Sequence, residues 1–87
     1  MKAIGIDING KKITFKADSD GYVECNYNNL TSLVLPDGVT CVNCNNNPIK
    51  EIVLPKSVTL AYLPIDCIVP NINDFLNRDD VYIYFWK

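Results

Sequence analysis

The chain repeats part of its own sequence at a distance of 19 residues, and this recurrence narrows the folds that it can adopt more than any other feature. Val23-Glu24-Cys25, for example, returns as Val42-Asn43-Cys44. A short period of this kind is typical of a chain that winds into stacked coils, in which each coil buries its apolar side chains against the next. The identical residues are Val23, Cys25, Asn26, Asn28, Val34, Leu35, Pro36, Val39 and Thr40, which recur as Val42, Cys44, Asn45, Asn47, Val53, Leu54, Pro55, Val58 and Thr59.

Each copy predicts one coil with a strand, a bend and a return segment. Successive side chains of a strand point to opposite sides, so the Val and Cys of Val23-Glu24-Cys25 are expected to face inward. An Asn follows at a fixed offset, at Asn28 and Asn47, and its amide can donate and accept hydrogen bonds at once. We therefore expect these amides to form a ladder that joins neighbouring coils at the bend. A third copy begins at Val58 and then decays, with Ala61, Leu63, Asp66 and Ile68 in the corresponding positions.

The two ends of the chain are predicted to cover the ends of this stack. Residues 2–17 alternate apolar and polar side chains on both sides of Asn9-Gly10, which predicts a β-hairpin with a type I′ turn. Residues 71–79 predict a short helix and residues 81–87 a strand. A stack of coils exposes an apolar surface at each end unless another element covers it. The hairpin side chains expected in the core are Ile4, Ile6, Ile8, Ile13, Phe15 and Ala17.

The string from Cys44 to Pro55 resembles the short leucine-rich repeats of bacterial and phage proteins, in particular the short-coil type of secreted bacterial effectors, where a Leu-Pro element ends each coil. The resemblance implies a mainly β fold: a short leucine-rich repeat solenoid with parallel strands, an N-terminal β-hairpin cap and a C-terminal helix-plus-strand cap. It also implies a protein-interaction scaffold that binds through the concave strand face. We expect a single domain over residues 1–87, with a cap in 1–21, repeats in 22–70 and a second cap in 71–87.

Composition argues against several classes of function. The chain has no His, which removes the commonest general base and metal ligand, so we expect no enzyme, no metal site and no cofactor. A net charge of −2 without a basic patch argues against nucleic acid. No apolar run approaches the ~20 residues that span a bilayer, so we expect no membrane contact. The expected location is cytoplasmic, and the host cytoplasm if the protein is phage-encoded.

The cysteines and one acidic loop have structural interpretations that we prefer to chemical ones. Cys25 and Cys44 share an inward position, and we expect packed free thiols, because in-register Cβ atoms lie ~4.8 Å apart, beyond the ~3.8 Å of a disulfide. Cys41 and Cys44 have the spacing of a zinc pair but lack a second pair. Cys67 is expected at a bend and partly exposed, and a nucleophile at Cys41 or Cys67 would lack a His to form its thiolate. Residues 18–21 predict a turn rather than a calcium loop.

The outward side of the predicted strands carries the candidate binding surface. Tyr62 lies on this side beside the last strand, where alternation directs Tyr82, Tyr84 and Trp86 outward if Val81 packs inward. Tyr and Trp dominate the hot spots of protein interfaces. The alternative is a one-residue slip that places the aromatic side chains of the last strand in the core. The residues expected to bind a partner are Tyr22, Glu24, Asn43, Tyr62, Tyr82, Tyr84 and Trp86.

The function expected from these observations is a non-enzymatic module that binds another protein through the strand face. Small size, the lack of catalytic groups and an Asn- and Ile-rich composition favour a phage or bacterial inhibitor of a cellular enzyme. The alternative is a structural subunit that self-associates into a homodimer through its exposed aromatic strand face or through a strand edge.

Overall fold

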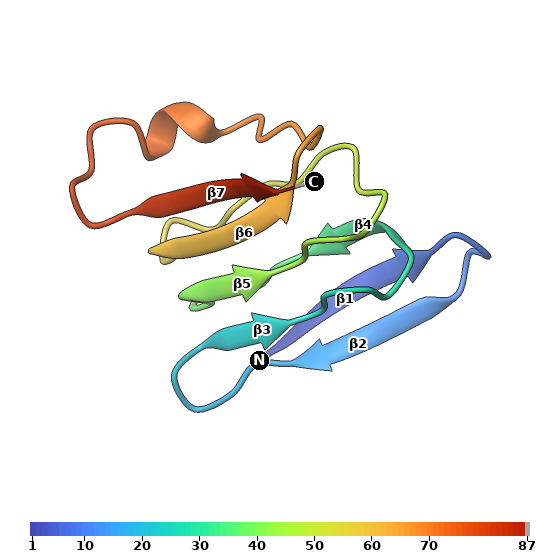
Figure 1. Ribbon diagram of the computed structural model, residues 1–87. Helices are drawn as coiled ribbons and strands as arrows, with labels where there is room; N and C mark the ends of the chain where they lie inside the picture. Colours follow the sequence, from blue (N-terminus) through green and yellow to red (C-terminus); the bar gives the residue numbers. More distant parts are fainter. Residues whose placement is uncertain (87) are drawn as a thin grey trace.

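The computed structural model describes residues 1–86, which form two β layers that enclose one hydrophobic core (Figure 1). One layer is a parallel sheet, and we call its solvent side the front face. The other, the return layer, consists of an antiparallel sheet and the extended segments 49–54 and 67–71. The parallel sheet has the order β3 (Tyr22–Glu24), β5 (Cys41–Asn43), β6 (Leu60–Pro64) and β7 (Tyr82–Trp86), and the antiparallel sheet the order β2 (Lys12–Lys16), β1 (Lys2–Asp7) and β4 (Leu30–Val34).

The parallel sheet follows the 19-residue recurrence directly. Val23 pairs with Val42 and Val42 with Ala61, so equivalent residues of successive coils lie side by side. All three are fully buried, as are Cys25 and Cys44 two residues further along. The predicted parallel strands and their inward side chains are therefore confirmed.

Asn47 joins the first two coils through a buried amide. Its Nδ2 donates to the carbonyls of Cys25 at 2.9 Å and Cys44 at 3.0 Å, and its Oδ1 accepts from the backbone N–H of Asn28 at 2.9 Å and of Leu30 at 3.0 Å. The predicted hydrogen bonding between coils is therefore confirmed at this position. The equivalent Asn28 bonds only the carbonyl of Asn26, within its own coil.

The N-terminal hairpin is confirmed, and so is the inward side of its second strand, where Ala17 is buried and Ile13 and Phe15 pack against the core. The first strand, in contrast, buries the face opposite to the one predicted. Ala3 and Gly5 are buried, whereas Ile4 and Ile8 are exposed. The physical reason is space: a Cβ on Gly5 would lie 2.7 Å from Cδ2 of Leu30, because large side chains of the neighbouring strands already fill the core there. The hairpin also pairs with β4, and so belongs to the return layer as well as covering the first coil.

The hairpin turn also differs from the predicted type I′ turn. The carbonyl of Asp7 accepts from the N–H of Gly10 at 3.0 Å, and only Gly10 has the positive φ, at 80°. The Asp7 carboxylate accepts from the N–H groups of Asn9 at 2.9 Å and Lys11 at 2.8 Å. An aspartate that bonds the backbone two residues later favours its own turn, which overrides the Asn-Gly preference.

The third coil departs from the repeat after β6. Cys67 and Val69 are buried while Ile68 is 64% exposed, so the predicted partial exposure of Cys67 is wrong, and Ile68 does not take up the buried position of its counterpart Ile49. Two changes in the sequence accompany this difference: Pro64 follows the strand, and Asp66 replaces the Asn of the repeat. The alternation of buried and exposed side chains after them is shifted by one residue. The third copy therefore follows the pattern of the repeat only as far as Leu63.

The C-terminal segment contains no α-helix. The helix predicted for residues 71–79 is reduced to one 3₁₀ turn, η1 (Ile72–Asp74), which buries Phe75 beside it. Arg78 holds the loop by donating to the carbonyl of Lys56 at 2.7 Å and pairing with Asp80 at 3.1 Å. The predicted strand is confirmed over Tyr82–Trp86, with Lys87 outside the described residues. Within residues 1–86 no helix is long and apolar enough to cross a membrane.

Candidate functional site

The front face is a set of side-chain rows that run across the four parallel strands. In-register pairing places Tyr22, Cys41, Leu60 and Tyr82 in one row. The next row on the same side consists of Glu24, Asn43, Tyr62 and Tyr84, and Pro64 and Trp86 extend the face at its far end. All seven residues predicted to bind a partner therefore lie on one face.

The half of the front face over β3 and β5 is polar and is ordered by one carboxylate. The hydroxyl of Tyr22 donates to Oε1 of Glu24 at 2.8 Å, and the amide of Asn43 donates to the same oxygen at 3.5 Å. The second oxygen, Oε2, accepts from the backbone N–H of Asn26 at 3.1 Å. These contacts fix the orientation of Glu24, so its charge is presented at a defined position.

The same arrangement keeps Tyr22 protonated at a pH at which an ordinary tyrosine ionises. Burial, the hydrogen bond to Glu24 and the negative charge of that carboxylate raise the pKa of Tyr22 to about 12. A phenol that stays protonated keeps donating its hydrogen bond. The polar half therefore acts as an ordered surface with fixed hydrogen bonds.

The half of the front face over β6 and β7 is aromatic. The rings of Tyr62 and Tyr84 stack with centroids 5.5 Å apart and planes 17° apart. Tyr82, Tyr84 and Trp86 are 58%, 44% and 51% exposed. We call Tyr62, Tyr82, Tyr84 and Trp86 the aromatic cluster. Pairing with β6 determines which way β7 faces, and this excludes the alternative in which these aromatic side chains of β7 are in the core.

All four cysteines are free thiols, with Cys41 on the front face, Cys25 and Cys44 beneath it, and Cys67 at the start of segment 67–71 in the return layer. Cys25 donates to the carbonyl of Asn43 and is fully buried, as is Cys44. Hydrogen bonding with the Cys25 thiol and burial raise the pKa of Cys44. Burial, with the charges of Asp18 and Glu24, raises the pKa of Cys41, and burial raises that of Cys67 to about 11. A thiolate is the reactive form of cysteine, so neither Cys41 nor Cys67 has the surroundings of a nucleophile.

The acidic loop before β3 is closed by its own backbone. Oδ1 of Asp18 accepts from the N–H groups of Asp20 and Tyr22, both at 2.9 Å, and Gly21 adopts a φ of 84°. The carboxylate is thus used in a turn, as predicted. Over residues 1–86 no group of three or more His, Cys, Asp or Glu side chains lies close enough to hold a metal ion.

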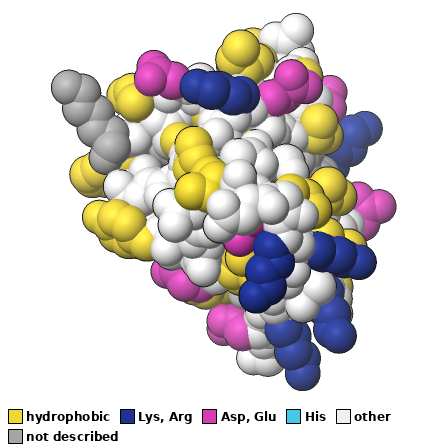
Figure 2. Space-filling view, turned by 90° about the vertical axis from the view of Figure 1, so that its right-hand side faces the viewer, with side chains coloured by type: hydrophobic (Ala, Val, Ile, Leu, Met, Phe, Trp, Pro, Cys, Tyr) yellow, Lys and Arg dark blue, Asp and Glu magenta, His cyan; other side chains and the backbone are white. Residues whose placement is uncertain are grey.

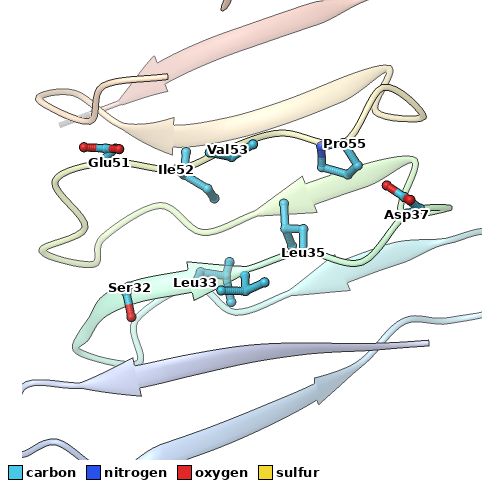
Figure 3. Close-up of a pocket in the computed structure, with 9 residues that line it drawn as sticks. Ser32, Leu33, Leu35, Asp37, Glu51, Ile52, Val53 and Pro55 are labelled. Atoms are coloured by element: carbon cyan, nitrogen blue, oxygen red, sulfur yellow. The ribbon is translucent and has the colours of Figure 1, made fainter. Parts of the chain in front are cut away.

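The return layer contains a groove that the sequence analysis did not predict. It lies between β4 and residues 51–55, has a volume of about 450 Å³, and receives Leu33, Leu35 and Ile52 from its two sides (Figure 3). Val34 and Val53 stand at its rim, 67% and 58% exposed. The sequence contained a signal for this groove, because Val34 and Val53 are one of the identical pairs and each lies between two buried Leu or Ile residues.

No protein-family model, no curated protein and no solved structure matches this chain. The arrangement of side chains on its two layers is therefore the basis for assigning it a function. Of the two layers, the front face combines ordered polar groups with exposed aromatic rings over a rigid sheet.

Proposed function

We propose that this chain is a short solenoid of the leucine-rich repeat type and that its front face binds another protein without catalysing a reaction. The recurrence of 19 residues, the in-register parallel strands and the buried Asn47 support the repeat assignment. Raised pKa values at Cys41 and Cys67, in a chain without His, support a binding role over a catalytic one.

The observation that carries this proposal is the aromatic cluster. Three of its four side chains are more than two-fifths exposed, although they stand on paired strands that hold them in place. Tyr and Trp offer a large contact area with few rotatable bonds, so little conformational entropy is lost when a partner covers them. The neighbouring carboxylate of Glu24, held by Tyr22 and Asn26, supplies a charge that orients the partner.

The partner proposed here is a protein with an apolar contact surface flanked by a basic side chain, because the front face pairs aromatic rings with one oriented carboxylate. A domain of this size acts by covering part of the surface of its partner. This mode of action fits an inhibitor of a cellular enzyme, and activity of the captured partner with and without the chain would measure the inhibition.

The test is affinity capture from bacterial lysate, with a front-face variant compared against a return-layer variant. Tyr62→Ala/Trp86→Ala removes part of the aromatic cluster, and Val34→Ala/Val53→Ala removes a similar exposed apolar surface from the opposite layer. We expect the wild type and the return-layer variant to hold a stoichiometric partner, and the front-face variant to bind it at least ~30-fold more weakly. Circular dichroism confirms that both variants are folded. Equal capture by all three proteins, or loss of the partner only with the return-layer variant, contradicts the proposal.

A further inference from the structure

The parallel sheet ends at β7 with an unpaired edge. In the part of the chain that the structure describes, β7 pairs with β6 and has no strand on its other side. The N–H of Tyr82 donates to the carbonyl of Thr59 at 2.8 Å, toward β6. Backbone groups of alternate residues point to opposite edges of a strand, so Ile83 and Phe85 direct their N–H and C=O groups to the open side. β7 therefore presents a row of donors and acceptors to another strand.

Of the other three outer edges, β2 and β3 carry features that discourage pairing, and β4 is flanked by residues 51–55 across the groove of the return layer. β2 has lysine at both ends, Lys12 and Lys16, and Figure 2 shows basic side chains gathered toward the part of the molecule that holds the hairpin. β3 has only three residues, of which Glu24 is charged. Charges and short length are the usual means by which proteins protect a sheet edge. β7 has five residues, Tyr-Ile-Tyr-Phe-Trp, without charge, Pro or Gly.

We propose that β7 pairs in an antiparallel direction with β7 of a second copy of this chain, about a twofold axis that passes beside Tyr84. In this register Ile83 faces Phe85 of the second copy, and the two residues exchange both backbone hydrogen bonds, as does the symmetry-related pair. All five residues of β7 overlap. A register centred on Ile83 would instead place Trp86 opposite Asp80, which makes it the poorer match.

The proposed register matches side chains as well as backbone groups. Tyr84 lies beside Tyr84 of the second copy on the front face, and Tyr82 lies beside Trp86, so aromatic side chains meet aromatic side chains. On the inner side Ile83 meets Phe85, which is 41% exposed in the single chain. No residue of β7 is charged, so no like charges are brought together at the axis. Because this strand edge is complementary to itself, the partner strand that fits it best is the same strand of a second copy.

Pairing would join the two front faces into one continuous sheet with an aromatic cluster on each side of the axis. The inference rests on the edge of β7 and not on the proposed partner protein. The two proposals therefore fail separately: a monomer that still captures its partner overturns the pairing alone, and a dimer without a partner overturns the proposed function alone.

The first test measures mass by analytical ultracentrifugation over a range of concentrations. We expect the wild type to form a dimer and Phe85→Pro to be monomeric, with a dissociation constant raised at least ~100-fold. Proline at this position removes an N–H that the single chain does not use, so the fold is retained, as in other edge strands. Phe85→Ala, which keeps the N–H, is the matched control and should weaken the dimer less. A wild type that remains monomeric at millimolar concentration overturns the proposal.

The second test fixes the register by disulfide cross-linking in a Cys41→Ser background, which leaves only buried native thiols. Directly opposite residues of a non-hydrogen-bonded antiparallel pair have Cα atoms ~4.5 Å apart, within the disulfide range. Tyr84→Cys should therefore form a cross-linked dimer on mild oxidation. Tyr82→Cys should not, because its copies would lie four residues out of register, at ~13 Å. Equal cross-linking of both variants, or cross-linking of Tyr82→Cys alone, rejects this register.

Discussion

The two ends of the parallel sheet differ: β3 belongs to the 19-residue repeat, whereas β7 comes from the segment that follows it. At the β3 end Val23 is fully buried, the strand lies against the hairpin, and Glu24 is held by hydrogen bonds. At the β7 end the corresponding inward residue, Ile83, is only partly buried and Phe85 is 41% exposed. The difference shows that covering the end of a stack of coils needs a separate element, which the hairpin provides at one end only. The predictions below test this contrast between a closed and an open end.

The largest effect is expected at Asn47, which ties the closed end together. Asn47→Ala leaves the buried N–H of Leu30 and the carbonyls of Cys25 and Cys44 without their partner. Each unsatisfied buried group costs about 1–3 kcal/mol, so the free energy of unfolding should fall by about 3–5 kcal/mol. Urea denaturation followed by circular dichroism measures this value. Asn28→Ala, which removes one hydrogen bond within its own coil, should cost about 1 kcal/mol, and equal losses would contradict the role of Asn47.

A direct comparison of the two ends uses one truncation at each. Val23→Ala creates a cavity in a filled core and should lower the free energy of unfolding by about 2–3 kcal/mol. Ile83→Ala removes more atoms but from a side chain that is partly exposed, so the monomer should lose only about 1 kcal/mol. Chemical denaturation in the monomeric Phe85→Pro background provides both values. A larger loss at Ile83 would show that the β7 end is closed as well.

The close packing of the core at the closed end also limits the size of the side chain that the hairpin can have at position 5. In Gly5→Ala the new Cβ would lie 2.7 Å from Cδ2 of Leu30, and adjustment of that side chain should cost about 1–3 kcal/mol. Thermal denaturation would record a lower midpoint. Thr14→Ala, at an exposed position of the same sheet, is the control and should change the midpoint little. Unchanged stability of Gly5→Ala would show that the hairpin packs more loosely than its burial indicates.

The smallest effect concerns pH and the polar half of the front face. The pKa of Tyr22 is raised to about 12, so the folded state favours the protonated phenol. Its contribution is present below the ordinary pKa of about 10 and is lost as pH rises through about 12, at a cost of about 1 kcal/mol because the site is largely hydrated. Tyr22→Phe should remove this step from a plot of unfolding free energy against pH. Tyr27→Phe, at a side chain that is 75% exposed, should retain it.

The sequence was sufficient for features that the repeat determines. The spacing of Val23 and Val42 gave the register of the parallel strands, and alternation within them gave the side that Tyr62 occupies. Asn47 could be assigned a role because a buried amide needs several partners at once. These features depend on contacts between equivalent positions of neighbouring coils. The pattern that produces them therefore appears in both copies of the repeat and can be recognised from one sequence.

The features that the sequence did not predict depend on contacts between unlike segments. Only the face of the first hairpin strand was inverted, because Ile4 and Ala3 alternate equally well and only the space beside Leu30 selects the smaller residues. The side of β7 needed the position of β6. The groove is the exception, because Val34 and Val53 are equivalent positions of the repeat, but its volume depends on how far apart their segments pack, which the pattern does not contain. The 3₁₀ turn at Ile72–Asp74 replaced a helix because Phe75 is buried beside a loop anchored by Arg78.

The three buried thiols have a kinetic consequence. Cys25, Cys44 and Cys67 lie in successive coils and are buried, so a thiol reagent reaches each one only when its own coil opens. Under these conditions the labelling rate of each cysteine reports how often that coil detaches. Variants that keep one of the three thiols would give the order in which the coils come apart, from the hairpin end to the end beside β7. The three native cysteines thus serve as probes of local unfolding, one for each coil.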